Sequence, residues 1–232
     1  MNGPSNTIDK ADEAQLLATI DRWVEREVAP RVKEFDHADR WPAELVEQMK
    51  ELGLFGATVS PDYGGLGLPA RTYAEIVMRV SSVWMALTGI FNSHLMLALA
   101  IEKFGTEPQK RHWLPRLASG EVRGGLALTE PDAGTDLQAI RLVARRDGDH
   151  YVLNGTKTWI SNGIEGSCFA LLVKTDPKAG HDGISAFMLD RERCGKSLRT
   201  EPIKDRLGIR AGDVGSIFMT DLEVPETNRI GD

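Results

Sequence analysis

One stretch of the sequence, Gly125 to Asp136, gathers several groups that could do chemistry. Its first part, Leu126-Ala127-Leu128, suits a buried strand, and a proline and a glycine then break regular structure. Such a strand-to-loop junction exposes backbone N–H groups beside the hydroxyls of Thr129 and Thr135. These donors can hold a phosphate or the polar edge of a heterocycle. Taken alone, however, the pattern is better explained by a strand that ends in an ordinary surface turn.

A second stretch, Trp159 to Gly163, again places an apolar residue, a hydroxyl and a turn in succession. The two stretches together closely resemble the acyl-CoA dehydrogenase family of flavoproteins. Ala127 to Asp136 fit every position of that family's flavin-binding signature, and a Trp-Ile-Ser or Trp-Ile-Thr strand follows it in the family as it does here. The resemblance covers nearly the whole chain and includes the Gly-Gly-Leu-Gly loop at residues 64–67 and the stretches 104–121 and 207–225.

The spacing of apolar residues changes near Glu121. Before it, they recur with the period of a helix, and helices are expected over residues 11–28, 42–52, 71–104 and from 107 onward. After it, they alternate as in strands. A helical half followed by a strand-rich half indicates the α+β class. We expect an N-terminal all-α helical domain at residues 1–121 and a β-sandwich or barrel-like middle domain at residues 122–232, with the site at their junction.

Local signals refine these elements. Thr106 and Gln109 form a capping box at a helix start, and Thr72 and Glu75 form a weaker one. Gly89 and the segment Asn92-Ser93-His94 are expected to interrupt the long apolar helix. Two hairpin turns are expected, at Asp147-Gly148 and at Asn154-Gly155.

The resemblance implies FAD as the cofactor and assigns its contacts residue by residue. The first segment would run along the isoalloxazine, with the Thr129 hydroxyl at its polar edge, and Gly134 would approach the pyrophosphate. Thr135 would contact both the pyrophosphate and the CoA part of the substrate, where most members of the family have Ser. The full set of expected cofactor-binding residues is Leu126, Ala127, Leu128, Thr129, Gly134, Thr135, Trp159, Ile160 and Ser161.

The resemblance also implies a reaction, the α,β-dehydrogenation of an acyl-CoA thioester to the 2-enoyl-CoA. In the family a Glu of a third, helical domain acts as the base, and that domain would follow Asp232. We therefore assign no catalytic residue here, take Glu130 and Asp136 as loop-fixing carboxylates, and expect this chain alone to be inactive. An electron-transfer flavoprotein is the expected partner and a homotetramer the expected assembly of the complete protein.

Two alternatives stay open. The same fold also serves acyl-CoA oxidases and related flavin monooxygenases, in which reduced flavin meets oxygen. A flavin- or acyl-CoA-binding module without catalysis is the second alternative.

The composition and charge of the chain argue against several other classes of function. The 232 residues carry a net charge of -6, which does not favour a nucleic-acid surface. The two cysteines lack metal or redox spacing, so a cytoplasmic location is expected and no metal site is assigned. No signal peptide and no membrane span are expected.

His94 and His112 are expected to be packed or solvated. Gly65 to Ala70 fit the letters of a dinucleotide fingerprint but lack the strand–helix–strand context.

Overall fold

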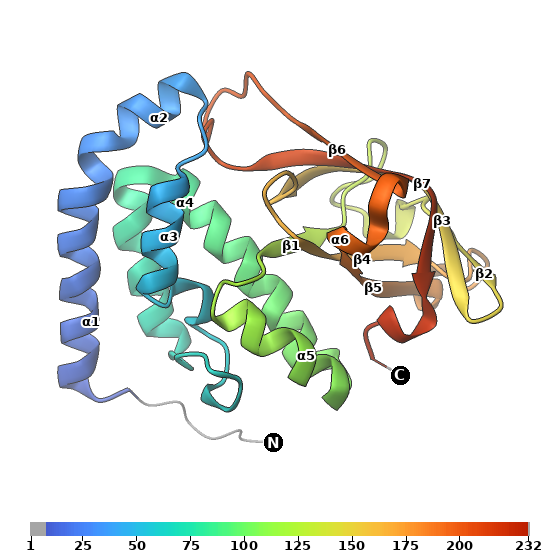
Figure 1. Ribbon diagram of the computed structural model, residues 1–232, viewed down its shortest axis with the longest axis horizontal. Coiled ribbons are helices and arrows are strands. Elements are labelled where there is room, and N and C mark those ends of the chain that lie inside the picture. Colours follow the sequence, from blue (N-terminus) through green and yellow to red (C-terminus); the bar gives the residue numbers. More distant parts are fainter. Residues whose placement is uncertain (1–7, 232) are drawn as a thin grey trace.

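The computed structural model describes residues 8–231 and divides into a helical part and a part built from two β-sheets (Figure 1). The helices come first and the strands follow, so the expected α+β class, an all-α part followed by a sandwich-like β part, is confirmed. The connection between the last long helix, α5 (Glu107–Ala118), and the first strand, β1 (Gly124–Ala127), contains the expected domain boundary. The exact division at residues 121 and 122 stays a prediction.

The N-terminal helices form a nearly continuous run. Helix α1 (Lys10–Trp23) continues through a π-helical turn (Val24–Val28) and a 3₁₀ turn (Ala29–Arg31) into α2 (Val32–Ala38). The proline in the 3₁₀ turn therefore changes the helix type without ending the run, and α2 is a helix that the sequence pattern did not indicate. Helix α3 (Ala43–Glu51) is followed by Gly53, whose φ of 71° ends it as expected.

Helix α4 (Ala70–Phe104) crosses the helical part from end to end and kinks at Trp84, where φ is -153° and ψ is 100°. Two expectations were wrong. The helix runs without interruption through Gly89 and the Asn92–His94 segment, because tertiary packing outweighs their modest helix propensity. Its N-cap is Pro69, and Thr72 instead lies buried and donates its hydroxyl hydrogen to Glu13. The capping box of α5 is confirmed.

Among the described residues, α4 is the one helix long and apolar enough to cross a membrane. Within its most apolar 18-residue window, 61% is buried inside the protein, as is typical of the core helix of a folded domain.

The β part consists of a three-stranded and a four-stranded sheet (Figure 1). The first has the order β1-β4-β5, with β1 parallel to β4 (Cys168–Lys174) and β5 (Ile184–Asp190) antiparallel to it. The second has the order β2-β3-β7-β6 and is antiparallel throughout. Its strands are β2 (Ala144–Asp147), β3 (His150–Ser161), β6 (Leu198–Pro202) and β7 (Val214–Pro225). One apolar core lies between the sheets, and the other joins the helices to β4 and β5.

One expected hairpin turn is absent. Asn154-Gly155 lies inside β3, which continues to Ser161, and the register with β7 shifts between Leu153 and Gly155. The extra residue of this β-bulge lies on the partner strand, because Thr220 and Asp221 of β7 together face Asn154, and Asp221 has a φ of 45°. The other expected turn, at Asp147-Gly148, connects β2 to β3 as predicted.

The two parts meet where β1 passes under α4. A Cβ atom on Gly125 would lie 2.6 Å from the carbonyl oxygen of Ser161 and 2.7 Å from Oγ of Ser93. Asn162, just after β3, donates from Nδ2 to the carbonyl oxygens of Ile90 at 3.0 Å and of Gly124 at 2.7 Å. These contacts hold α4, β1 and β3 together so closely that no side chain fits at position 125.

Asp213, just before β7, fixes the turn that follows β3. Its two carboxylate oxygens accept hydrogen bonds from the N–H groups of Ile164 at 2.9 Å and Glu165 at 2.7 Å, while its carbonyl oxygen accepts from Asn162. As a whole residue, Asp213 is 9% exposed. Burial raises the pKa of this carboxyl group to about 6, although the two N–H donors favour the ionised form.

We expect Gly125→Ala to lower the free energy of unfolding by about 1–3 kcal/mol, because the added methyl group overpacks the junction of α4, β1 and β3. Gly89→Ala is the matched control, since a Cβ there meets no atom within 4 Å. It should raise stability by up to about 1 kcal/mol through helix propensity. Urea unfolding of both variants checks this, and equal effects would contradict the close packing at Gly125.

The raised pKa of Asp213 predicts a pH dependence of stability. The folded state binds this proton more tightly than the unfolded state, so the stabilisation is present below about pH 4 and is lost as pH rises through about 6. Asp213→Asn removes the titration. The difference in unfolding free energy, wild type minus variant, should fall by about 1–3 kcal/mol between pH 4 and pH 7. A difference that is flat or that rises over this range would show that the carboxyl group is not destabilised by burial.

Candidate functional site

The two stretches singled out by the sequence lie side by side. The N–H of Thr158 donates a hydrogen bond of 2.9 Å to the carbonyl oxygen of Thr129, and Gly125 packs against Ser161 at the other end of the pair. The turn after β1 and the last residues of β3 therefore face the same region, although about 30 residues separate them in the chain.

A buried lysine holds this turn from the β3 side. The side chain of Lys157 is 0% exposed, and its Nζ donates to the carbonyl oxygen of Leu128 at 2.8 Å and to Oε1 of Glu130 at 2.9 Å. Glu130 also accepts from the N–H of Arg141 at 2.6 Å and of Leu142 at 3.1 Å. The carboxylate thus closes the loop from residue 130 to residue 142.

Burial and hydrogen bonding act in opposite directions on the pKa values of this pair. Burial opposes the charge on Glu130, but the N–H donors and the Lys157 ammonium outweigh it and hold the pKa of Glu130 below its ordinary value. Burial lowers the pKa of Lys157, and Glu130 offsets part of that effect. Glu130 is therefore a loop-fixing carboxylate, as the sequence predicted. Asp136 has the same role, since Oδ1 accepts from the N–H of Gln138.

The turn presents polar groups that the described part of the chain does not use. In residues 8–231, neither the N–H nor the hydroxyl of Thr129 has a hydrogen-bond partner. Gly134 and Thr135, later in the same turn, are exposed to solvent. A Cβ on Gly134 would touch only Cγ2 of Thr129, at an ordinary 3.7 Å. The fold itself does not require a glycine there. Free donors beside an open glycine fit a bound group with a phosphate or a polar ring edge.

Trp159 is held in an unusual backbone conformation. Its φ of 58° is rare for an aromatic residue, and the register between β3 and β7 shifts between Lys157 and Ile160. The bulge turns the side chain outward, where it is 59% exposed. Such conformations cost on the order of 1–3 kcal/mol and occur preferentially at functional sites. The geometry makes the indole face available to a ligand.

Trp159 and Ser161 line a cavity of about 450 Å³ between α4, β3 and the connection from β6 to β7, which we call the Trp159 cavity. Its walls are mainly apolar, and Leu207 on its rim is 106% exposed. Asp213 is the one carboxylate among its lining residues, and both of its oxygens accept backbone N–H groups. The remaining lining residues are Ala86, Gly89, Ile90, Arg206, Gly208, Ile209, Gly212 and Val214.

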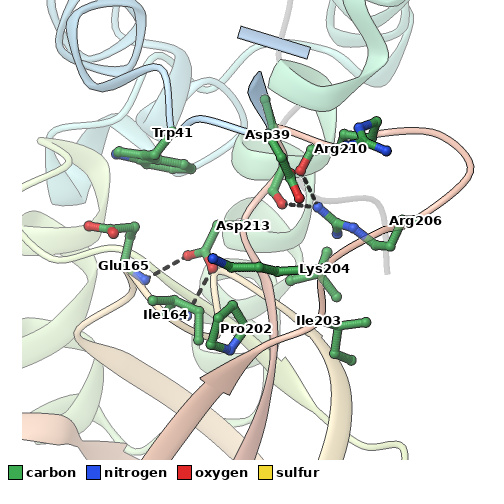
Figure 2. Close-up of a pocket in the computed structure, with 13 residues that line it drawn as sticks. Asp39, Trp41, Ile164, Glu165, Pro202, Ile203, Lys204, Arg206, Arg210 and Asp213 are labelled. Carbon is green, nitrogen blue, oxygen red and sulfur yellow. Dashed lines mark hydrogen bonds between the residues drawn. The ribbon is translucent and has the colours of Figure 1, made fainter. Parts of the chain in front are cut away.

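The connection from β6 to β7 is shaped by Arg206 and Asp213 (Figure 2). The Arg206 guanidinium donates to the carbonyl oxygens of Arg210 and Gly212, which folds the connection back on itself. Arg210 in turn donates from Nε to the carbonyl oxygen of Asp36 at 3.2 Å, so the connection is tied to α2. Beneath it lies a second cavity, of about 110 Å³, lined by residues such as Trp41, Lys204 and Asp213.

The expected cofactor-binding residues do not all line one cavity. Leu126 and Leu128 turn toward a third cavity, of about 470 Å³, between β1, β5 and the end of α4. Ala127 and Ile160 are buried in the core between the sheets, so only their backbone groups can contact a ligand. The side chains of Trp159 and Ser161 face the Trp159 cavity. The nine residues thus form one continuous backbone surface, with side chains divided between two cavities. Their role as cofactor ligands stays a prediction.

Sequence reasoning missed two parts of this site. Lys157 lies in β3 in phase with the buried residues Tyr151 and Leu153, and this alternation could have marked its position as a buried one. The connection from β6 to β7 was recognised by resemblance but received no role, because its position across the Trp159 cavity from α4 depends on the tertiary fold. His94 and His112 are confirmed as a packed and an exposed histidine. In the described part of the chain, no cluster of three metal-binding side chains is found.

Comparison with known proteins agrees with this arrangement. Residues 10–121 match the family description "Acyl-CoA dehydrogenase, N-terminal domain" and residues 125–222 match "Acyl-CoA dehydrogenase, middle domain". The short-chain specific acyl-CoA dehydrogenase of Clostridium acetobutylicum is 38% identical over 221 residues, which are 94% of this chain and 58% of that protein.

Two solved structures extend the comparison. One, described as an electron transferring flavoprotein of Acidaminococcus fermentans, has a TM-score of 0.90 and 33% identity, over 98% of this chain and 60% of that one. A glutaryl-CoA dehydrogenase of Mycobacterium smegmatis in complex with FADH2 has a TM-score of 0.84 and 29% identity. That comparison covers 97% of this chain and 56% of the other chain. The chain therefore spans little more than half the length of these relatives. By both domain matches, it belongs to the acyl-CoA dehydrogenase family.

Proposed function

We propose that this chain forms the flavin-binding part of a FAD-dependent acyl-CoA dehydrogenase, which oxidises the bond between carbons α and β of an acyl-CoA thioester. The observation that supports it most directly is the hydrogen bond from Thr158 N–H to the Thr129 carbonyl, at 2.9 Å. It brings the two segments of the flavin signature into one surface, with unpaired donors on one side and the exposed Trp159 on the other.

Several residues would hold FAD in this proposal. The backbone of residues 126–129 and the Thr129 hydroxyl would meet the polar edge of the isoalloxazine, and Trp159 would pack against the ring. Ser161 would offer its hydroxyl to a ring nitrogen. Gly134 and Thr135 would approach the pyrophosphate, where the open space at Gly134 permits close contact.

The chemistry is shared between the cofactor and the chain. Bound FAD would supply a hydride acceptor for the β carbon. The chain's own residues bind, orient and exclude water. Thr135 would also hold the CoA part of the substrate, and the apolar walls of the Trp159 cavity suit the acyl part. The cavity's one carboxylate, Asp213, is occupied by Ile164 and Glu165, so we infer that the base comes from outside residues 8–231.

The proposal extends to the complete protein. A homotetramer in the cytoplasm, acting in fatty acid metabolism, would pass electrons to an electron-transfer flavoprotein. The relatives act on different acyl groups, short-chain and glutaryl thioesters among them, and we assign no particular acyl group here.

Flavin binding can be tested through tryptophan fluorescence. Added FAD should quench the emission of the five tryptophans, and Trp159→Phe should remove much of that quenching because this ring would stack on the cofactor. Trp113→Phe is the matched control, since Trp113 is buried on α5 and away from the Trp159 cavity. Equal quenching in both variants would count against flavin at Trp159.

Turnover separates the remaining alternatives. With acyl-CoAs and an artificial electron acceptor, the 232-residue chain should bind FAD but show no dehydrogenation, because residues 8–231 place no free carboxylate in the Trp159 cavity. Robust turnover would contradict that expectation and would direct attention to Asp213. Peroxide formation from acyl-CoA would instead favour the oxidase alternative.

A further inference from the structure

Burying the charged side chain of Lys157 in the protein interior costs desolvation free energy. Its side chain is 0% exposed, and a buried ion pair is often no more stable than apolar residues of similar size. Its neighbours on β3 show that apolar side chains fill such positions here, as Leu153 and Ile160 do. The stability of the fold alone therefore gives no clear reason for an ammonium group at this position.

The contacts of Lys157 show what the ammonium group does. Its Nζ donates to the carbonyl oxygen of Leu128 at 2.8 Å. A peptide group is planar and trans, so the C=O of Leu128 and the N–H of Thr129 point in opposite directions. Holding that oxygen on the Lys157 side directs the N–H of Thr129 away from the core.

The next peptide group is fixed from the same strand. The N–H of Thr158 donates to the carbonyl oxygen of Thr129 at 2.9 Å, so two successive carbonyls of the turn are held by two successive residues of β3. Glu130 completes the anchor by accepting from Lys157 at 2.9 Å. Among residues 8–231, nothing accepts the N–H of Thr129.

We propose that Lys157 is a positioning residue of the cofactor site: through the Leu128 carbonyl it orients the Thr129 N–H as a preformed donor to an acceptor atom on the flavin ring edge. The inference rests on the proposed function. A preformed donor needs no reorganisation when the ring binds, which favours affinity. Lys157 itself does not touch the cofactor.

The test compares Lys157→Met with the unsubstituted chain and with Leu222→Ala. Methionine keeps the length of the side chain but has no donor. Leu222 lies on β7 in the same core and pairs with Leu153, so its truncation lowers stability without altering the turn. Three quantities are measured for each protein: the affinity for FAD, the position of the visible absorption band of bound FAD, and the unfolding midpoint without FAD.

We expect Lys157→Met to weaken FAD binding about tenfold, the effect of one oriented hydrogen bond, and to shift the visible band. Leu222→Ala should lower the unfolding midpoint but keep the affinity and the band of the wild type. If Lys157→Met keeps the wild-type affinity and band, Lys157 serves only the fold and the inference is overturned.

Two further outcomes are distinguishable. Absence of FAD binding by the unsubstituted chain would overturn the proposed function, and with it this inference. Should Lys157→Met not fold, Lys157→Met combined with Glu130→Gln takes its place, because it removes the ammonium donor without leaving an unpaired carboxylate in the core. A weakened affinity with a shifted band supports the positioning role, and wild-type values exclude it.

Discussion

The hydrogen bonds that Lys157 and Thr158 donate to the turn after β1 make a single surface of two segments that are distant in the chain. The carbonyl groups of Leu128 and Thr129 accept hydrogen bonds from β3, and no group within residues 8–231 pairs with the N–H or hydroxyl of Thr129. Polar groups that the fold orients but does not use are the basis of a binding site.

Strain and exposure concentrate around the same surface. Trp159 adopts a positive φ and presents its ring to a cavity, and Leu207 and Ile209 stand exposed on that cavity's rim. Apolar side chains gathered at one opening indicate a surface that another group covers. The chain spans 56–60% of the length of these two solved structures.

Asp213 connects the stability of the fold to the shape of the cavity. It fixes the turn after β3 through Ile164 and Glu165, and it stands beside the connection that Arg206 folds back on itself (Figure 2). A carboxylate with both oxygens occupied is a structural element, despite its raised pKa. The walls of the site are therefore built by the protein's own polar network, and their apolar surface remains for a ligand.

The sequence by itself determined the class of fold, the order of helical and strand-rich parts, the capping box of α5 and the two segments of the flavin signature, because periodicity, caps and short motifs are local properties of the chain. Only the tertiary structure decided that Gly89 stays within α4, that Asn154-Gly155 continues β3 opposite a bulge in β7, and that Lys157 anchors Leu128. Those outcomes depend on packing and hydrogen bonds between residues far apart in sequence, which no local pattern records.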